Sequence, residues 1–275
     1  MHRFYLPPDA WPAATLTGGE AHHARDVLRL QPDDRLTIFD GSGREATAAV
    51  AALAPGAVQL RILQETTTAP LRCRITLAQA IPKGKNMDLI VQKAVEIGAA
   101  EIVPLLSART VVRLDPASAA QKQSKWQQVA IEAAKQCGQN WLPQVRRPAT
   151  PADFFASVAA VYDRRPPEPS KARRSQTAAT ADAARRSATA GDYDLRLIGS
   201  LQPGARHLRQ ILGEQPERPR SVLMMIGPEG DFTPAEIALA RAHGCAPLTL
   251  GPIILRVETA AIYCLSILSY ELLSA

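Results

Sequence analysis

From residue 74 onward, short apolar segments alternate along the chain with longer segments that have helical periodicity. The segments expected to form strands are 74–80, 101–105, 159–162, 195–198, 221–226 and 247–250. The segments expected to form helices are 87–97, 118–137, 151–157, 233–243 and 257–273. Gly98 and Gly244 stand where helix ends favour glycine, and Thr233 begins a capping box with Glu236. Strands that alternate with helices predict an α/β domain with a largely parallel sheet over residues 71–275.

Residues 1–70 have a different pattern, with short β-rich segments at 36–39, 46–50 and 58–63 and a turn cluster at 40–43. One helical piece is expected at 19–30, and it carries His22 and Arg25. The 275 residues are too many for one small core. We therefore expect a separate N-terminal β-barrel-like domain over residues 1–70.

The composition is that of a globular protein, with 46% apolar and 21% charged residues. No apolar run is long enough for a membrane helix, and the first eight residues have no apolar core of a secretory signal. We therefore expect a cytoplasmic protein with no membrane contact. The four cysteines form no C-x-x-C pair, which favours free thiols and predicts no metal site.

The formal net charge of +6 is unevenly distributed. Residues 71–163 and residues 164–191 each carry a net charge of +5, and the rest of the chain is slightly acidic. The 164–191 segment has no aromatic or large aliphatic residue, so we expect a disordered insertion. Its arginine pairs could contact RNA loosely or belong to a tolerated solvated loop. The basic 71–163 region is the better indication of a polyanionic partner.

Two expected strands end in glycine-containing loops, at 226–231 and 250–252. Ligands of open α/β sheets bind at the carboxyl ends of strands, and glycines there allow close approach of the backbone. Neither loop is a dinucleotide or Walker motif, and Glu229 makes a phosphate cradle unattractive. A ligand with a cationic centre and an adenine fits better. The alternative is that these glycines only form turns that pack the sheet.

Charged residues at two further places are candidates for function. Arg256 and Glu258 lie between an apolar strand and an apolar helix. They could act at the site, or they could pair with each other or cap the helix. Lys83, Lys85 and Arg109 lie in loops beside expected strands and suit phosphate contacts.

Together these motifs resemble the family of 16S rRNA uracil-N3 methyltransferases, within the superfamily of knotted (SPOUT) S-adenosylmethionine enzymes. The matching segments are 2–5, 22–30, 81–88, 92–98, 126–143, 226–230 and 250–260. The resemblance implies a PUA-like RNA-binding β-barrel at the N-terminus, a parallel-sheet domain with a trefoil knot at the C-terminus, and a homodimer. Asp231 departs from the family pattern, in which a glycine is usual at this position.

The resemblance also implies a cofactor, a substrate and site residues. S-adenosylmethionine would be held by Leu201, Ile226, Gly227, Glu229, Gly230, Leu250, Gly251, Ile254 and Leu255. The methyl group would go to N3 of a uridine in 16S rRNA of the small ribosomal subunit. Arg256 and Glu258 are the catalytic candidates, and the RNA-binding candidates are Arg3, His22, Arg25, Lys83, Lys85 and Arg109. The alternatives are a knotted methyltransferase that acts on a ribose 2′-OH or a tRNA base, and a non-catalytic RNA-binding protein.

Overall fold

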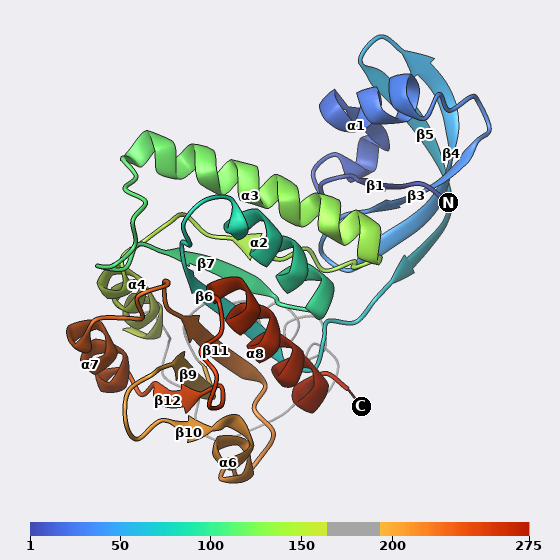
Figure 1. Cartoon of the computed structure of the whole chain (residues 1–275). Helices are drawn as coiled ribbons and strands as arrows, with labels where there is room; N and C mark the ends of the chain where they lie inside the picture. The colour runs from blue at the N-terminus through green and yellow to red at the C-terminus, as the bar shows by residue number, and fades with distance from the viewer. Residues whose placement is uncertain (164–192, 275) are drawn as a thin grey trace.

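The computed structural model describes residues 1–163 and 193–274, which form two domains (Figure 1). The expected disordered insertion at 164–191 lies outside the described residues. The N-terminal domain is a five-stranded sheet in the order β1-β3-β4-β5-β2. Its elements are β1 (Arg3–Tyr5), η1 (Trp11–Ala13), β2 (Thr15–Thr17), α1 (Gly18–His22), η2 (His23–Val27), β3 (Arg35–Phe39), β4 (Arg44–Ala54) and β5 (Ala57–Thr67). Bulges in the long β4–β5 pair bend this sheet around its own apolar core, which confirms the expected barrel-like domain.

The C-terminal domain contains a seven-stranded sheet in the order β10-β12-β9-β11-β6-β7-β8. Every pair of neighbouring strands in this sheet is parallel, as the sequence predicts. The strands are β6 (Arg74–Ala80), β7 (Glu101–Leu105), β8 (Gln144–Val145), β9 (Leu195–Gly199), β10 (Arg206–His207), β11 (Ser221–Ile226) and β12 (Ala246–Thr249). The helices are α2 (Asn86–Ile97), α3 (Pro116–Cys137), α4 (Pro151–Asp163), α6 (Leu208–Gly213), α7 (Pro234–Ala242) and α8 (Val257–Leu272). The predicted domain boundary at residue 70 falls in the connection between β5 and β6.

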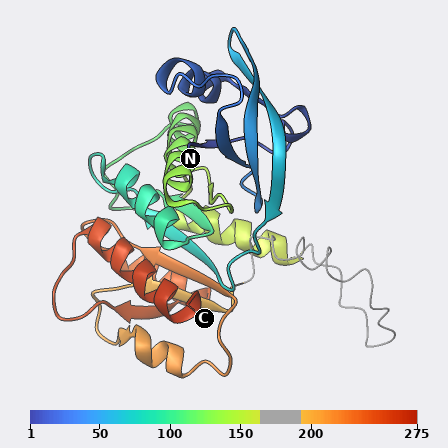
Figure 2. The same ribbon diagram turned by 90° about the vertical axis from the view of Figure 1, so that its right-hand side faces the viewer.

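Helices cover both faces of this sheet, so its strands are apolar on both sides. Along β11, Met224 packs into the core shared with α2, α3 and α8. The neighbouring side chains of Leu223 and Met225 pack into the core shared with α4 and α7. Figures 1 and 2 show α2 and α8 side by side on one face. This arrangement explains why β11 is readable from sequence as one uninterrupted apolar segment.

The expected helix-end signals are present, and one expected strand is wrong. Gly98 ends α2 with φ of 97°, and Thr233 and Glu236 form the capping box of α7. Residues 159–162 are not a strand, because α4 continues as a helix to Asp163. A short apolar run cannot be assigned by periodicity alone, and the two alanines in this one favour a helix.

The described cysteines are all free, as expected. Cys73, Cys245 and Cys264 are buried, and burial raises the pKa of each thiol to about 12. Over 1–163 and 193–274, no group of three or more potential metal ligands comes together. Within the same ranges, no helix has both the length and the apolar character that a membrane span requires.

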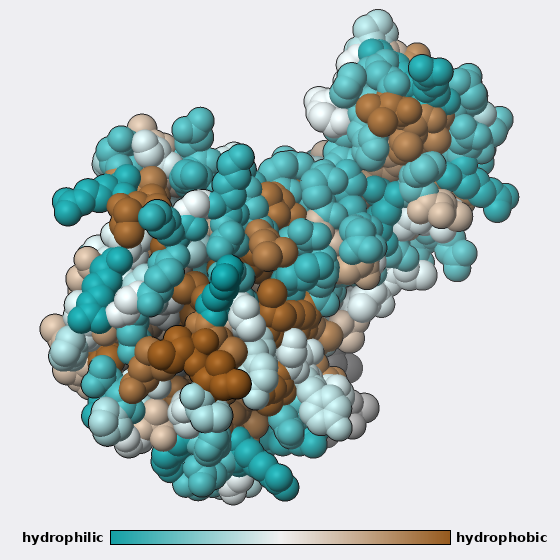
Figure 3. Space-filling view, in the orientation of Figure 1, coloured by the Kyte–Doolittle hydropathy of each residue, from teal (hydrophilic) through white to brown (hydrophobic). Residues whose placement is uncertain are grey.

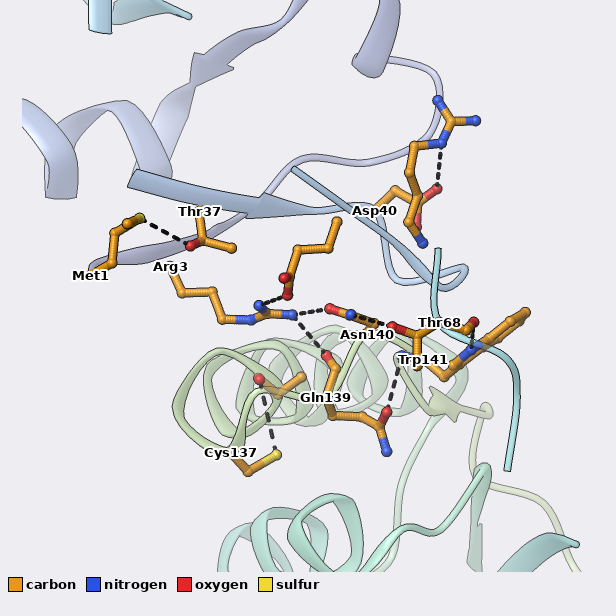
Figure 4. Close-up of polar contacts among 12 residues, drawn as sticks. Met1, Arg3, Thr37, Asp40, Thr68, Cys137, Gln139, Asn140 and Trp141 are labelled. Atoms are coloured by element: carbon orange, nitrogen blue, oxygen red, sulfur yellow. Dashed lines mark hydrogen bonds and ion pairs between the residues drawn. The ribbon is translucent and has the colours of Figure 1, made fainter. Parts of the chain in front are cut away.

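The N-terminal domain is attached to the end of α3 by a polar network (Figure 4). Arg3 pairs with Glu45 of its own domain and donates to the side chain of Asn140. Asn140 donates to Thr68 Oγ1 at 2.8 Å, and Trp141 Nε1 donates to the Thr68 carbonyl at 2.9 Å. Only 11% of the Arg3 side chain is exposed. Arg3 therefore joins the two domains, and its predicted role as an RNA contact stays a prediction.

A second contact between the domains is an ion pair of Lys135 on α3 with Glu20 on α1. Lys135 Nζ lies 3.0 Å from Glu20 Oε1, and the two side chains are 8% and 17% exposed. Burial raises the pKa of Glu20 above its usual range, although the hydrogen bond and charge of Lys135 act in the opposite direction. In the folded protein, Lys135 therefore stabilises the charged form of Glu20.

We expect Lys135→Met to lower the free energy of unfolding by about 3 kcal/mol at pH 7.5, because it leaves a buried carboxylate unpaired. The loss should be smaller near pH 5. Without Lys135 the folded-state pKa of Glu20 rises further. A carboxyl with a raised pKa stabilises the fold fully at low pH, where it is protonated, and this stability is lost as the pH rises through the folded-state pKa. Urea unfolding at both pH values measures the effect. Lys122→Met, on the same helix, is the control, and an equal loss at both pH values would contradict the assignment.

Candidate functional site

The carboxyl ends of β6, β9, β11 and β12 surround a pocket with a volume of about 580 Å³. Its walls are the loops that follow these strands together with the start of α8. A volume in this range suits a drug-sized or cofactor-sized ligand. The pocket therefore lies where a parallel α/β sheet is expected to bind its ligand.

The pocket brings together most of the residues that the sequence predicts for the cofactor. Eight of them line it: Leu201, Ile226, Gly227, Glu229, Leu250, Gly251, Ile254 and Leu255. Gly230 is not among the lining residues. Gly199 and Ser200 complete the wall that Leu201 begins. These contributions come from three different strand ends, so the pocket exists only in the folded chain.

Two glycines in the pocket have a clear structural reason. A Cβ added at Gly227 would lie 3.2 Å from the Phe232 backbone nitrogen and 3.3 Å from Asp231 Oδ1. Gly251 has φ of 110°, a conformation that side chains rarely adopt. Both glycines therefore meet a local backbone requirement, and both also line the pocket.

The loop after β11 is held by side chains that the sequence assigns to other tasks. Glu229 accepts a hydrogen bond from the Lys83 backbone N–H at 2.9 Å. Arg109 donates from its guanidinium to the Gly230 carbonyl. Glu236 of the α7 capping box also accepts from the Ala108 N–H at 2.8 Å. The loops after β6 and β7 therefore brace the loop that forms one wall of the pocket.

Arg256 and Glu258 lie at the start of α8, and both line the pocket. Arg256 occupies the N-cap position but makes no capping bond with its side chain. Among the described residues, no ion pair forms between Arg256 and Glu258. The alternative in which the two side chains only pair with each other or cap the helix is therefore not observed. Both remain available to a bound substrate.

The residues predicted to contact RNA lie in two separate places. Lys83 lines the pocket, and the exposed Lys85 lies at the N-cap of α2 beside it. His22 and Arg25 lie on the N-terminal domain, where both contact the carboxylate of Asp26. The hydrogen bonds from Arg25 and His22 hold the pKa of Asp26 below its usual value.

Several lining residues were not predicted as site residues, and two of them are polar side chains at the ends of loops. Asn86 is the first residue of α2, and Asp231 follows Gly230 in the loop after β11. The only signal for Asp231 in the sequence was that the family usually has glycine at this position. That difference does not indicate what the aspartate side chain does. Asn86 adjoins the predicted basic loop and has no signal of its own.

Both domains match known protein families, and the whole chain is similar to known proteins. Residues 69–269 match the RNA methyltransferase domain family, and residues 16–63 match the RNA methyltransferase PUA domain family. The chain is 32% identical over 247 residues to the ribosomal RNA small subunit methyltransferase E of Synechocystis, covering 90% of this chain and 69% of that protein. It is 29% identical over 267 residues to the protein of the same name from Bacillus subtilis, covering 94% and 91%.

Solved structures give the same result. A methyltransferase from Legionella pneumophila, solved with the bound cofactor S-adenosylmethionine, has a TM-score of 0.76 at 32% identity and covers 98% of this chain and 97% of its own. Ribosomal RNA small subunit methyltransferase E from Neisseria gonorrhoeae, bound to S-adenosylmethionine, has a TM-score of 0.72 at 30% identity, with 98% of each chain covered. The chain belongs to the family of ribosomal RNA small subunit methyltransferases E, which combine a PUA-like domain with a knotted SPOUT methyltransferase domain.

Proposed function

We propose that this protein transfers a methyl group from S-adenosylmethionine to N3 of a specific uridine in 16S rRNA of the small ribosomal subunit. The observation that carries the proposal is the pocket at the strand ends, in a chain of this family, with Arg256 and Glu258 at its edge. Membership of the family supports small-subunit ribosomal RNA as the substrate. The choice of N3 rests on the resemblance of the motifs.

The charges in the pocket suit S-adenosylmethionine. The carboxylates that line the pocket belong to Glu229, Asp231 and Glu258. The cationic groups that line it belong to Lys83 and Arg256. A ligand with a sulfonium, an ammonium and a carboxylate meets both signs of charge in such a site. Ile226, Leu250 and Leu255 supply apolar surface for the adenine. The cofactor seen in the Legionella and Neisseria relatives supports this assignment.

N3 of a neutral uracil carries a proton, which must leave when the new N–C bond forms. S-adenosylmethionine supplies a methyl group that is already activated by its sulfonium. In our proposal the carboxylate of Glu258 accepts the N3 proton. The Arg256 guanidinium stabilises the negative charge that develops on the uracil oxygens. Because the donor is activated, positioning of the base supplies much of the acceleration.

The proposed RNA face has two parts. Lys83 and Lys85 lie beside the pocket and would contact phosphates near the target base. His22 and Arg25 lie on the PUA-like domain and would contact the rRNA at a distance from it. Arg109 is exposed and could reach RNA only with groups that do not hold Gly230. Arg3 is left out because it is used between the domains.

We further propose that the protein acts as a homodimer joined through α8. Tyr263 and Tyr270 lie two helical turns apart and are 46% and 73% exposed. Ile253 and Ile254 in the loop before α8 are 73% and 77% exposed. Figure 3 shows apolar side chains gathered over and beside α8 on this face. An exposed apolar surface of this kind is typical of an interface, and here it adjoins the pocket.

Gly227→Trp should abolish cofactor binding, because the indole would occupy the pocket or displace Phe232 behind it. We expect the Kd for S-adenosylmethionine to rise more than about a hundredfold in calorimetry, since the ligand volume itself is filled. Gly213→Trp is the matched control, because a Cβ at this position at the end of α6 meets nothing within 4 Å. Unchanged affinity in Gly227→Trp would show that the pocket is wrongly assigned.

Primer extension across 16S rRNA tests substrate and chemistry together. N3 methylation blocks the pairing edge of the base, so a deletion strain should lose one reverse-transcriptase stop at a uridine. The wild-type gene should restore that stop. In vitro, Glu258→Gln should lower kcat about a hundredfold, as expected for loss of a general base. The cofactor Kd should stay unchanged. A modified ribose or a modified tRNA in nucleoside mass analysis would instead support the alternative methyltransferase.

The dimer is tested by sedimentation velocity. The wild-type protein should sediment at twice the chain mass of 29.6 kDa. The double variant Tyr263→Glu/Tyr270→Glu should sediment as a monomer, because charge on an apolar interface opposes association. Val27→Glu, at an exposed residue of the N-terminal domain, is the control and should remain dimeric. A monomeric wild-type protein would refute the proposed assembly.

A further inference from the structure

Asp231 has a backbone conformation that is unusual for a residue with a side chain. Its φ is 61°, in the left-handed region that favours glycine. Aspartate tolerates this region better than most residues because its short polar side chain can bond to the nearby backbone. Among the described residues, the other non-glycine residues with positive φ are Ala14, Arg29 and Asp33, all in the N-terminal domain. Asp231 is thus the one such residue that lines the pocket.

Both carboxylate oxygens of Asp231 accept hydrogen bonds from backbone N–H groups. Oδ1 accepts from Phe232 at 2.7 Å, within the loop after β11. Oδ2 accepts from Leu201 at 3.2 Å, in the loop after β9. A turn bond from the Asp231 N–H to the Pro228 carbonyl, at 2.9 Å, fixes the backbone from which this side chain projects. A single side chain therefore connects two walls of the pocket.

This connection matters most for the wall formed by residues 199–201. Ser200 is buried, and its N–H bonds to the Leu248 carbonyl at 3.0 Å, which secures the start of the loop. Leu201 is 64% exposed, so packing does little to hold it. The bond from its N–H to Asp231 Oδ2 is the contact that ties residue 201 to the loop after β11. A glycine at position 231 could adopt the same φ but could not make this bond.

The contact also limits the space at Gly227. A Cβ at that position would meet Asp231 Oδ1 at 3.3 Å, so the carboxylate lies close to Gly227. Asp231 is therefore in contact with the pocket lining at both Gly227 and Leu201.

We propose that Asp231 is a positioning residue that ties the loop after β9 to the loop after β11 and thereby sets the affinity of the pocket for its cofactor. The inference rests on the proposed function for the identity of that cofactor. The residue acts through the two backbone N–H groups that it holds. It takes no part in the transfer of the methyl group, so its effect belongs in binding and in KM rather than in kcat.

The test compares Asp231→Gly, Asp231→Asn and Asp33→Gly. Glycine keeps the backbone conformation and removes both bonds, while asparagine tolerates the conformation and keeps one acceptor oxygen. Asp33 has φ of 67° in the N-terminal domain, so its glycine variant is a control for the same change in a residue with the same backbone conformation. Calorimetry gives the Kd for S-adenosylmethionine, and hydrogen exchange of the ligand-free protein reports on the backbone at residues 199–205.

We expect Asp231→Gly to weaken cofactor binding about tenfold, the scale of one lost charge-assisted hydrogen bond. KM for the cofactor should rise in step while kcat stays within about twofold of wild type. Exchange at residues 199–205 should be faster in Asp231→Gly, intermediate in Asp231→Asn and unchanged in Asp33→Gly.

Wild-type affinity together with wild-type exchange in Asp231→Gly would overturn the proposal. Equal losses in Asp231→Gly and Asp33→Gly would do the same, because they would indicate a general loss of stability. A wild-type protein that does not bind S-adenosylmethionine would refute the proposed cofactor. Exchange on the ligand-free protein does not depend on the cofactor, so it would still decide whether Asp231 holds residue 201. Should Asp231→Gly fail to fold, the same measurements on Asp231→Asn decide the matter.

Discussion

The parallel pairing of β11 with β9 on one side and β6 on the other determines where every part of the site lies. In this register Ile226 lies opposite Gln79, and Met225 lies opposite Ile198. The three strands therefore end at nearly the same level, and the loops that follow them leave the sheet side by side. Parallel strands place all their carboxyl ends at one edge, so a pocket can form there from segments far apart in sequence.

The return of α8 across this edge completes the pocket. β12 lies outside β9, yet the chain after it comes back to pack α8 on β6, β11 and α2. The loop before α8 and the first turn of α8 therefore cover the same strand ends that β9 and β11 supply. Arg256 and Glu258 lie in the pocket because of this return. No local feature of residues 250–258 specifies it, and it was anticipated only through the order of motifs along the whole chain.

Much of the fold could be predicted, and the exceptions have physical reasons. The bounds of β7 and β11 agree with those expected because both strands are buried on two faces and, after their first residues Glu101 and Ser221, are apolar throughout. The two-residue strands β8 and β10 lie at the sheet edges and are too short to have a pattern. The prediction of a strand at residues 159–162 was wrong because a short apolar run is compatible with a buried strand and with a buried helix.

The site was predictable where it depends on the backbone and less so where it depends on side chains. Glycines after strands indicated the pocket, because a close approach of backbone to ligand requires residues of that kind. Arg109 was predicted as a phosphate contact from its place in a loop, and Arg3 as an RNA contact from the resemblance. In the structure Arg109 donates to the Gly230 carbonyl and Arg3 donates to Asn140. These partners are 121 and 137 residues away in sequence. A basic residue is the same in the sequence whether its partner is a phosphate or a distant carbonyl, so only the fold separates the two.

The same long-range contacts connect the two ends of the proposed RNA face. The N-terminal domain is held at the end of α3 by Asn140 and Lys135, and α3 packs along α2. The first residue of α2, Asn86, lines the pocket. A continuous path of packed helices and ion pairs thus runs from the PUA-like domain to the pocket at the strand ends. An RNA that contacts both ends meets a fixed separation, and recognition of folded RNA by shape requires a protein that keeps such a separation constant. In this structure that constancy depends on contacts between the domains, among them the bonds of Arg3 to Glu45 and Asn140.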